Sequence, residues 1–216
     1  MDRSRVGLVI PALNESVSIG SVVAGASQYG TVIVVDDGST DGTGEIASLA
    51  GAQVVVHSTN RGYDAAINSG FARAASLGCE VVITLDADGQ HDPHLIAKFI
   101  EMIESGVQLV VGVRSERQRL TEHLFAWYTR FRFGIEDPLC GMKAYRIAIY
   151  NGLGHFDSYS SVGTELMLYA ATHGYSIRQV RFQVRDRVGG PSRFGTILRG
   201  NYRILRALVI SIFKFP

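Results

Sequence analysis

The stretch TLDADGQHDP, residues 84–93, crowds carboxylates behind an apolar run with the look of a buried strand. Asp86, Asp88 and Asp92 raise each other's pKa at this spacing unless a cation or hydrogen-bond donors compensate. With one residue between them in an extended segment, Asp86 and Asp88 point to the same side. One can then face a sugar or ribose while the other binds a hard, oxygen-preferring cation. The motif therefore predicts a divalent-metal site. His91 lies beside the acids and could join the metal ligands, but it is expected to be a solvated loop residue.

A second acidic group, VVDDGSTDGT, follows another apolar run. Its glycine, serine and threonine residues favour a turn, and Thr40 or Asp41 would cap the helix that follows. Two adjacent acids, Asp36 and Asp37, are more than a cap needs. They are suited to accept hydrogen bonds from a nucleotide's base edge and ribose hydroxyls. Asp64 precedes a helix of small residues and is expected to cap its N-terminus.

These motifs lie at the ends of predicted strands. Continuous apolar runs rich in β-branched residues, typical of strands buried on both faces, occur at 6–10, 31–35, 52–56, 80–85 and 107–113. Segments of helical length and periodicity lie between them, at 16–28, 40–50, 64–77 and 93–104. This alternation predicts a parallel, doubly wound sheet with right-handed crossovers. Ligands of such sheets bind outside the carboxyl ends of the strands, so one sheet edge is expected to carry the site.

The composition indicates one ordinary globular domain with an uneven charge distribution. The 216 residues carry a net charge of +1, with 46% hydrophobic and 19% charged residues. Residues 178–216 hold nine Lys/Arg and one acid, a net +8, which leaves −7 for residues 1–177. The basic tail suggests an anionic partner such as phosphate or a membrane surface. Nucleic acid is not expected, because no aromatic-interleaved basic motif accompanies the charge.

The chain is expected to be cytoplasmic and peripheral at a membrane face. Its two cysteines, Cys79 and Cys140, lack metal-site spacing and form no disulfide framework, which fits a reducing compartment. The N-terminus turns polar too soon for a signal peptide, and no run reaches the roughly 18 apolar residues of a transmembrane helix. Residues 194–215, FGTILRGNYRILRALVISIFKF, mix arginines with bulky apolar residues. This segment suits either a core-packing helix with a basic face or a membrane-surface helix.

Eight motifs occur in an order that resembles family 2 glycosyltransferases of the GT-A fold. They are PALNE, VVDDGSTDGT, NRG, LDADGQHDP, GVR, DPLCGMKAYR, an isolated Glu165 and RVGGPSR, and they span nearly the whole chain. The resemblance is strongest to the polyprenyl-phosphate, dolichol-phosphate mannosyltransferase-like branch. It implies an α/β, Rossmann-like domain with a mostly parallel central sheet flanked by helices. It also implies inverting transfer from GDP-mannose or a UDP-hexose to a dolichyl or undecaprenyl phosphate, with Mg²⁺ or Mn²⁺ as cofactor.

The resemblance assigns roles to individual residues. Nucleotide-sugar binding is implied for Pro11, Ala12, Asn14, Glu15, Asp37, Asp86, Gln90 and Arg114. The metal is expected on Asp88, with Asp86 next to it. Arg187, Ser192 and Arg193 match the phosphate-handling motif RxxGxSK, with arginine in place of the usual lysine.

The resemblance covers one domain, residues 1–216, with two functional parts. Residues 1–114 would form the nucleotide-sugar-binding half, and residues 115–216 an irregular acceptor-side half that includes the basic C-terminal segment. Three features depart from the family pattern. The family often has glycine where Asp64 stands, the stretch between Arg114 and Asp137 is shorter than usual, and no transmembrane hairpins follow.

The acceptor chemistry leaves two mechanisms open. A phosphate monoester, with a second pKa of roughly 6, is an anion at neutral pH and needs no general base. A hydroxyl on a soluble glycan or protein needs one, and the candidates are Asp137 and Glu165, the latter on a helix predicted at 163–173. Asp137 could instead serve a turn, and Glu165 could stabilise its helix dipole. Arg187 and Arg193 would stabilise the departing diphosphate. The intact motifs argue against the non-enzyme alternative, an inactive partner subunit.

Overall fold

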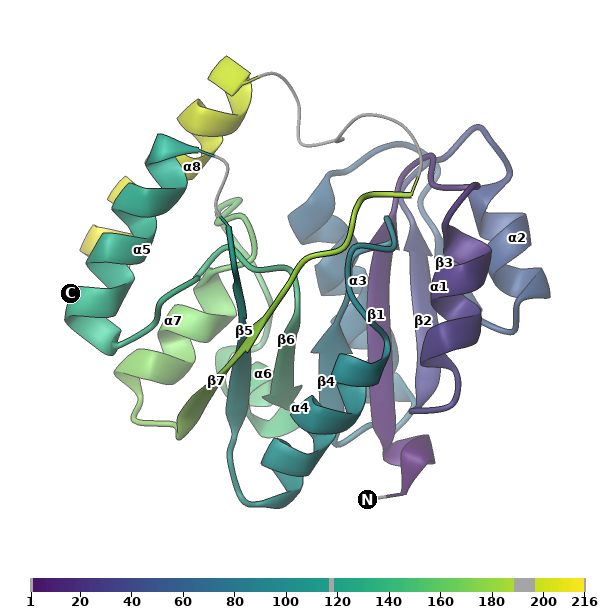
Figure 1. The fold of residues 1–216 in the computed structure, drawn as a ribbon, viewed down its shortest axis with the longest axis horizontal. Coiled ribbons are helices and arrows are strands. Elements are labelled where there is room, and N and C mark those ends of the chain that lie inside the picture. Colours follow the sequence, from purple (N-terminus) through teal and green to yellow (C-terminus); the bar gives the residue numbers. More distant parts are fainter. Residues whose placement is uncertain (1, 117–118, 189–196, 216) are drawn as a thin grey trace.

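The protein is built around one mixed β-sheet (Figure 1). The computed structural model describes residues 2–116, 119–188 and 197–215. Within these ranges the sheet has seven strands in the order β3-β2-β1-β4-β6-β5-β7. The strands are β1 Val6–Ala12, β2 Thr31–Asp36, β3 Gln53–Val56, β4 Val81–Thr84, β5 Leu109–Arg114, β6 Lys143–Arg146 and β7 Ile177–Phe182. Neighbouring strands are parallel except around β6, which runs antiparallel between β4 and β5.

Helices cover both faces of the sheet. They are α1 Ile19–Ala26, α2 Thr43–Leu49, α3 Tyr63–Ser76, α4 His94–Glu104, α5 Leu120–Phe133, α6 Ile147–Leu153, α7 Glu165–Thr172 and α8 Ile197–Lys214, with a 3₁₀ turn at Arg3–Arg5. Side chains alternate between faces along a strand, so Leu8 and Ile10 of β1 pack with α1, α2 and α4. Val9 lies in the core on the other face, together with residues of α3 and α5–α8.

The first half of the chain follows the predicted pattern. β1–β5 begin and end within two residues of the five apolar runs, and α1–α4 lie within three residues of the predicted helices. Helices bury β1, β2, β4 and β5 on both sides, as continuous apolar strands predict, whereas the edge strand β3 is only partly buried and exposes Val56. Gly70 brings α3 onto the sheet, since a Cβ there would lie 2.2 Å from Val9 Cγ1. The mostly parallel sheet is thus confirmed, and a purely parallel one is wrong because of β6.

The second half is regular, which corrects the expectation of an irregular extension. It contributes β6, β7 and the helices α5–α8 to the described structure, and α7 confirms the helix predicted at 163–173. The sequence hid β6 because this strand has only four residues and carries charges at both ends, Lys143 and Arg146. Pairing with β4 on one side and β5 on the other stabilises it nonetheless.

The helix caps differ from the prediction. Gly42, with φ of +83°, precedes α2, while Asp41 accepts a hydrogen bond from the N–H of Thr43 at 3.1 Å. Gly62, with φ of +91°, precedes α3, and Asp64 lies buried in the first turn of that helix. Backbone geometry that favours glycine therefore starts both helices.

The C-terminal helix α8 lies beside α5 at one end of the molecule (Figure 1). Ile204, Ala207 and Leu208 are buried against the domain, so the helix does pack on the core. Its other side exposes large apolar side chains, among them Leu198 and Phe213. Of the helices in the described ranges, none combines the length and apolar character needed to cross a membrane.

Candidate active site

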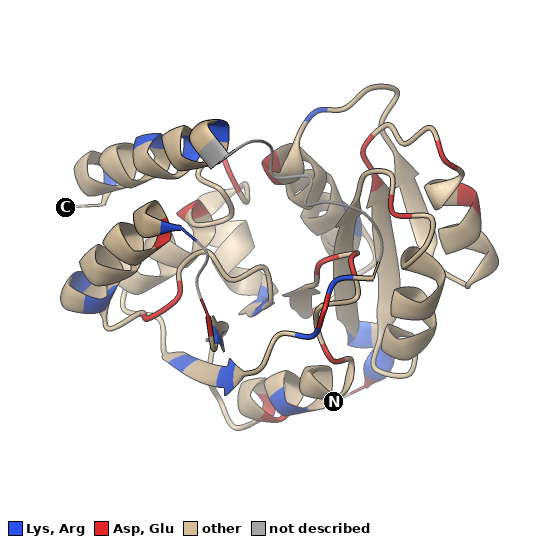
Figure 2. Cartoon of the chain, turned by 45° about the horizontal axis from the view of Figure 1, so that its top comes forward, with Lys and Arg blue, Asp and Glu red and all other residues tan. Residues whose placement is uncertain are grey.

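A cleft of about 460 Å³ opens where the predicted strand ends meet. Its lining includes Pro11 and Ala12 from β1, Asp37 after β2, Asn60 and Gly62 after β3, Asp86 and Asp88 after β4, and Arg114 from β5. Acidic and basic residues both lie on the loops around this edge (Figure 2). The rule that ligands bind outside the carboxyl ends of strands therefore locates the cleft.

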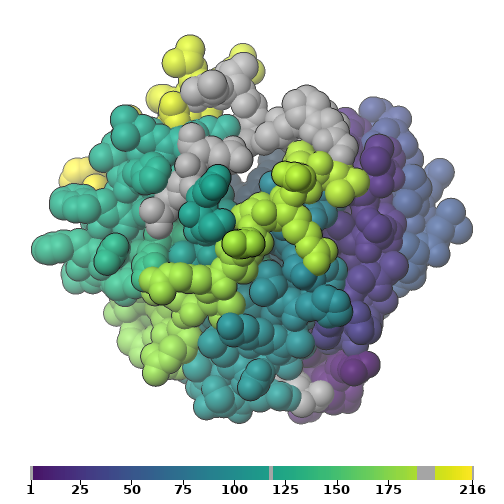
Figure 3. All heavy atoms as spheres, viewed as in Figure 1, coloured from purple at the N-terminus to yellow at the C-terminus, as the bar shows by residue number. Residues whose placement is uncertain are grey.

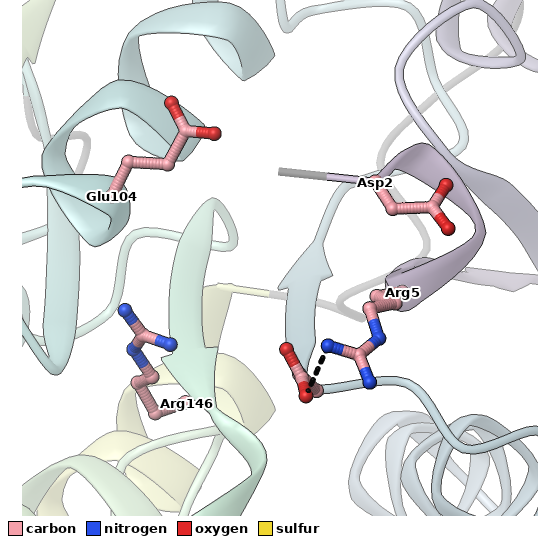
Figure 4. A pocket seen from close by; sticks show the side chains of 5 residues that line it. Asp2, Arg5, Glu104 and Arg146 are labelled. Atoms are coloured by element: carbon pink, nitrogen blue, oxygen red, sulfur yellow. Dashed lines mark ion pairs between the residues drawn. The ribbon is translucent and has the colours of Figure 1, made fainter.

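A second depression, of about 520 Å³, lies at the opposite edge of the sheet (Figure 4). It is lined by Asp2, Arg5, Glu80, Glu104 and Arg146. The ion pair between Arg5 and Glu80 spans 2.8 Å, and both side chains are about half exposed. Water screens charges in such a position, so size alone does not make this depression a site.

Asp37 forms one wall of the cleft and fastens the strand ends together. Its carboxylate accepts hydrogen bonds from the backbone N–H of Arg61 at 2.9 Å and of Gly62 at 2.7 Å. It also pairs with His57 Nδ1 at 2.6 Å. Asp36 instead accepts the N–H of Ser39 at 2.9 Å. The predicted pair thus divides: Asp37 lines the cleft, and Asp36 holds the turn.

In the loop after β1, Glu15 faces the cleft and Asn14 contacts the neighbouring loop. Asn14 has φ of +53°, and its Oδ1 accepts the N–H of Thr40 at 2.9 Å. The N–H of Glu15 donates to Thr43 Oγ1 at 2.9 Å. Glu15 lines the cleft with Pro11 and Ala12, whereas Asn14 joins the β1 loop to the β2 loop.

The acidic motif after β4 forms the floor of the cleft. Asp86 and Asp88 both line it, and burial together with the nearby Asp86 raises the pKa of Asp88. His91 Nδ1 accepts the N–H of Asp86 at 3.3 Å, which assigns the ring proton to Nε2, 3.7 Å from Asp86 Oδ2. His91 is buried, so the expected solvated position is wrong. A Cβ at Gly141 would lie 2.3 Å from an Asp86 oxygen, so glycine makes room for this carboxylate.

Arg187 reaches the same motif from the segment that follows β7. Its Nη1 donates to Asp88 Oδ2 at 2.7 Å, and its Nη2 donates to Glu15. Gln90 is held nearby, where its backbone N–H donates to Asp88 Oδ1 at 3.1 Å. The expected phosphate-handling arginine is thus brought to the predicted metal motif. Ser192 and Arg193 lie outside the described residues.

Arg114 forms the opposite wall and is held by Asp137. Its Nε and Nη2 donate to the two carboxylate oxygens of Asp137 at 2.8 and 2.9 Å, and its backbone N–H donates at 3.1 Å. Burial alone would raise the pKa of Asp137, but the hydrogen bonds and charge of Arg114 outweigh it and lower that pKa. Asp137 is buried behind Arg114 and orients this arginine toward the cleft.

A family model for glycosyl transferase family 2 matches residues 8–159, which include the whole acidic floor of the cleft. The chain belongs to glycosyl transferase family 2. An uncharacterized glycosyltransferase of Mycobacterium tuberculosis is 31% identical over 91% of this chain and 92% of its own. The polyprenol monophosphomannose synthase of Mycolicibacterium smegmatis is 29% identical over 88% of this chain and 80% of its own. The resemblance to the polyprenyl-phosphate branch is therefore confirmed.

Solved structures confirm the GT-A fold of this family 2 glycosyltransferase. Glucosyl-3-phosphoglycerate synthase from Mycobacterium tuberculosis, in complex with Mn²⁺ and UDP-glucose, superimposes with a TM-score of 0.76 at 25% sequence identity. The match covers 98% of this chain and 79% of that one.

Four further charged residues of the family 2 transferase line the cleft, and the sequence motifs assigned no role to any of them. They are Arg119, Glu122, Lys143 and Arg203. Glu122 lies 3.2 Å from Arg114 and 3.5 Å from Arg119. Lys143 is buried, and its Nζ donates to the carbonyl of Cys140 at 2.7 Å. Arg119 directly precedes α5, and the other three lie on α5, β6 and α8. Only the tertiary fold brings them to the strand ends.

Glu165 lies away from the cleft, in a buried polar cluster. Its carboxylate accepts from His155 Nε2 at 3.0 Å, from the N–H of Ser158 at 2.5 Å and from Lys214 Nζ at 2.6 Å. Burial would raise the pKa of Glu165, but these hydrogen bonds, led by that of Lys214, lower it. Through Lys214, Glu165 therefore joins the start of α7 to the end of α8.

The acidic floor suits a metal ion that binds jointly with a phosphate ligand. Mg²⁺ in proteins commonly takes one or two carboxylates together with substrate phosphates and water. Asp86 and Asp88 supply such carboxylates. Burial, and then the charge of the neighbouring Asp86, raise the pKa of Asp88, and a bound cation would favour its ionised form. In the described ranges, no group of three His, Cys, Asp or Glu side chains could hold the ion by itself. The donor set fits the metal when a diphosphate completes it.

Proposed function

We propose that this family 2 glycosyltransferase moves a hexose from a nucleotide-diphosphate sugar to a polyprenyl phosphate, with inversion at the anomeric carbon. The observation that carries the proposal is one cleft that combines acids with several arginines. Acids after β1, β2 and β4 line it. Arg187 pairs with two of these acids, Asp88 and Glu15. The lining also includes Arg114 from β5 and Arg203 from α8. An acidic floor suits a metal–diphosphate, and arginines suit a second anion.

The donor would bind at the acidic floor. Asp86 and Asp88 would hold Mg²⁺ or Mn²⁺, which would act when bound as a Lewis acid on the departing diphosphate. Asp37 would accept a hydrogen bond from the ribose or base through the lone pairs that its backbone partners leave. The Mycobacterium tuberculosis structure with Mn²⁺ and UDP-glucose supports this class of donor.

The acceptor would be an anion that Arg114 contacts. Arg114 donates from Nε and Nη2 to Asp137 and from Nη2 to Glu122. Its Nη1 would contact the acceptor phosphate, because guanidinium groups pair well with phosphate oxygens. Both oxygens of Asp137 are engaged and its pKa is lowered, which makes it a poor general base. Glu165 lies outside the cleft lining. A phosphate monoester, already ionised at neutral pH, fits such a site better than a hydroxyl.

The helices α5 and α8 would bring the enzyme to its lipid acceptor. Large apolar side chains are exposed on both: Leu120, Leu124, Trp127 and Phe131 on α5, and Leu198, Tyr202, Leu205, Val209, Ile212 and Phe213 on α8. Arg130, Arg132 and Arg206 lie among them, exposed. Apolar bulk with basic charge is typical of helices that lie on anionic membranes. Because α8 also places Arg203 in the cleft, the lipid phosphate would reach the site next to that surface.

A donor screen tests the proposal. Purified protein is incubated with Mn²⁺ and each of UDP-glucose, UDP-galactose, UDP-N-acetylglucosamine and GDP-mannose, with and without undecaprenyl phosphate. We expect one donor to release its nucleoside diphosphate only when the lipid is present, with the sugar entering the organic phase with inverted anomeric configuration. Transfer to a water-soluble hydroxyl acceptor without stimulation by the lipid would overturn the acceptor assignment.

A matched pair of variants tests the metal site in the same assay. Asp88→Asn should lose at least about 100-fold in turnover, because a charge-assisted contact made in the transition state is worth a few kcal/mol. Asp92→Asn is the control, since Asp92 lies in the same loop but pairs with Arg185. Full activity of Asp88→Asn in a chelating buffer would contradict the metal assignment.

A further inference from the structure

The segment that follows β7 crosses over the acidic floor of the cleft. Residues 183–188, called the strap below, form the yellow-green band beyond β7 that lies across the face of the molecule in Figure 3. The N–H of Val188 donates to the carbonyl of Asp88, and that of Arg185 donates to Gln90, each at 3.0 Å. Two backbone hydrogen bonds therefore hold the strap along the loop that carries the predicted metal ligand.

The strap delivers one guanidinium between two carboxylates. Arg187 Nη1 lies 2.7 Å from Asp88 Oδ2, and Nη2 contacts Glu15. The side chains of Arg187, Asp88 and Glu15 are only 19%, 11% and 9% exposed. Water screens ion pairs poorly at such depth, so this bridge carries more weight than a surface pair would.

Arg187 contacts the carboxylate that is the predicted metal ligand. Oxygen Oδ2 of Asp88 takes the guanidinium at 2.7 Å, and Oδ1 accepts the N–H of Gln90 at 3.1 Å. A cation that binds Asp88 must therefore displace Arg187 from Oδ2 or compete with it. Glu15 remains as one partner of the displaced guanidinium, and a diphosphate beside the metal would be the second.

We propose that Arg187 is the resident counter-ion of Asp88 and makes metal binding depend on the donor. The ion takes Asp88 only when the diphosphate offers Arg187 a replacement partner, so ion and donor bind together. The inference rests on the proposed metal–diphosphate function. Coupling of this kind is reciprocal: the nucleotide tightens metal binding by the same factor by which the metal tightens nucleotide binding.

Manganese binding without turnover tests the coupling. Free Mn²⁺ is measured by electron paramagnetic resonance in titrations of the full chain, alone and with UDP or GDP. We expect weak binding of Mn²⁺ alone and tight binding with one of the nucleotides. Arg187→Ala should bind Mn²⁺ alone at least about tenfold more tightly, because a hydrogen bond between charged groups is worth 1.5–3 kcal/mol. The enhancement by nucleotide should shrink in this variant.

Arg185→Ala is the matched control. Arg185 lies on the same strap and pairs with Asp92, and its side chain is largely exposed. A general loss of positive charge would change Mn²⁺ affinity equally in both variants, whereas a specific counter-ion changes it only in Arg187→Ala. Arg187→Gln, which keeps a polar side chain, provides a second variant should the alanine form fail to fold.

Two failures are distinguishable. If the unaltered protein does not bind Mn²⁺ even with either nucleotide, the proposed metal site is wrong. If it binds Mn²⁺ with nucleotide, and Arg187→Ala or Arg187→Gln binds Mn²⁺ alone no more tightly than the unaltered protein, the counter-ion role is overturned while the proposed function stands.

Discussion

The hydrogen-bond partners of each carboxylate near the cleft decide what that carboxylate can do chemically. Asp88 meets a guanidinium on its open side, Asp37 meets two backbone N–H groups, and Asp137 is held on both oxygens by Arg114. A carboxylate with both oxygens engaged and a lowered pKa orients its partner and is not available to take a proton. At the scale of single residues, Asp137 is therefore a positioning residue for Arg114.

Asp137→Asn tests this positioning role. Removing one partner of a buried ion pair leaves the other charge uncompensated, which typically costs about 3–5 kcal/mol. We expect a loss of that order in the free energy of unfolding measured in urea. We also expect a raised KM for polyprenyl phosphate and an unchanged pH profile of kcat. Glu136→Gln is the control, because its partner Arg181 is exposed and surface pairs contribute less than about 1 kcal/mol.

A general base would behave differently. In that case Asp137→Asn would remain stable and bind donor and acceptor normally, yet lose more than about 100-fold in kcat. This result would restore the hydroxyl-acceptor mechanism.

At the scale of elements, α5 and α8 each have one face in the core and one in solvent. Phe125 and Ile204 are fully buried, whereas Trp127 and Phe131 are 70% and 84% exposed. The two exposed rings stack with centroids 6.2 Å apart. Tryptophan favours the headgroup level of a bilayer, so this exposed pair is well suited to the proposed membrane contact.

The double variant Trp127→Ser, Phe131→Ser tests this contact. Full burial of such a side chain is worth about 1.5–3 kcal/mol, so we expect at least about a tenfold loss of binding to vesicles of phosphatidylcholine and phosphatidylglycerol in co-sedimentation. The Tm should hardly change, because both rings are exposed. Leu49→Ser is the control, since Leu49 is 89% exposed on α2. Equal vesicle binding by the unaltered protein, the double variant and Leu49→Ser would rule out a role of Trp127 and Phe131 in membrane binding.

At the scale of the whole molecule, the two functional parts share one sheet and are joined by side chains. Asp64 on α3 accepts the N–H of Gly163 at 2.7 Å, across 99 positions of sequence. Asn68 on the same helix accepts the N–H of Phe156 at 2.8 Å. Residues 1–114 and the described part of 115–216 are therefore packed together as one unit.

The Asp64 contact makes stability depend on pH. Burial is the main cause that raises the pKa of Asp64 from 3.8 to about 6. The folded state then binds a proton more readily than the unfolded chain, so this group's stabilising contribution is complete below about pH 4 and is lost as pH rises through about 6. We expect the free energy of unfolding of the unaltered protein to fall relative to Asp64→Asn by roughly 2–3 kcal/mol between pH 4 and pH 7. Urea denaturation at four pH values measures it, and parallel curves would contradict it.

The local sequence pattern predicts the first half of the fold and the acidic floor of the cleft. Continuous apolar runs predict β1–β5, and Asp86 and Asp88 directly follow one of these runs. The rest depends on contacts between distant segments. Glu122 lies outside the quoted motifs, and Lys143 lies in the motif DPLCGMKAYR without an assigned role. Both become part of the cleft only when α5 and β6 fold against the strand ends. The buried position of His91 also depends on a distant residue. The ring of Phe182, 91 positions later, lies against it with 5.6 Å between ring centroids, so the local sequence predicts a solvated position wrongly.

The antiparallel strand β6 has a consequence for synthesis on the ribosome. Its neighbours β4 and β5 end at Thr84 and Arg114, but β6 itself is complete only at Arg146. Until then the inner edge of β4 has no partner in the final sheet, and open strand edges invite pairing with other chains. A nascent or truncated chain that stops near residue 114 would therefore be prone to aggregate. For this reason, residues 1–114 are not expected to be stable as a separate protein.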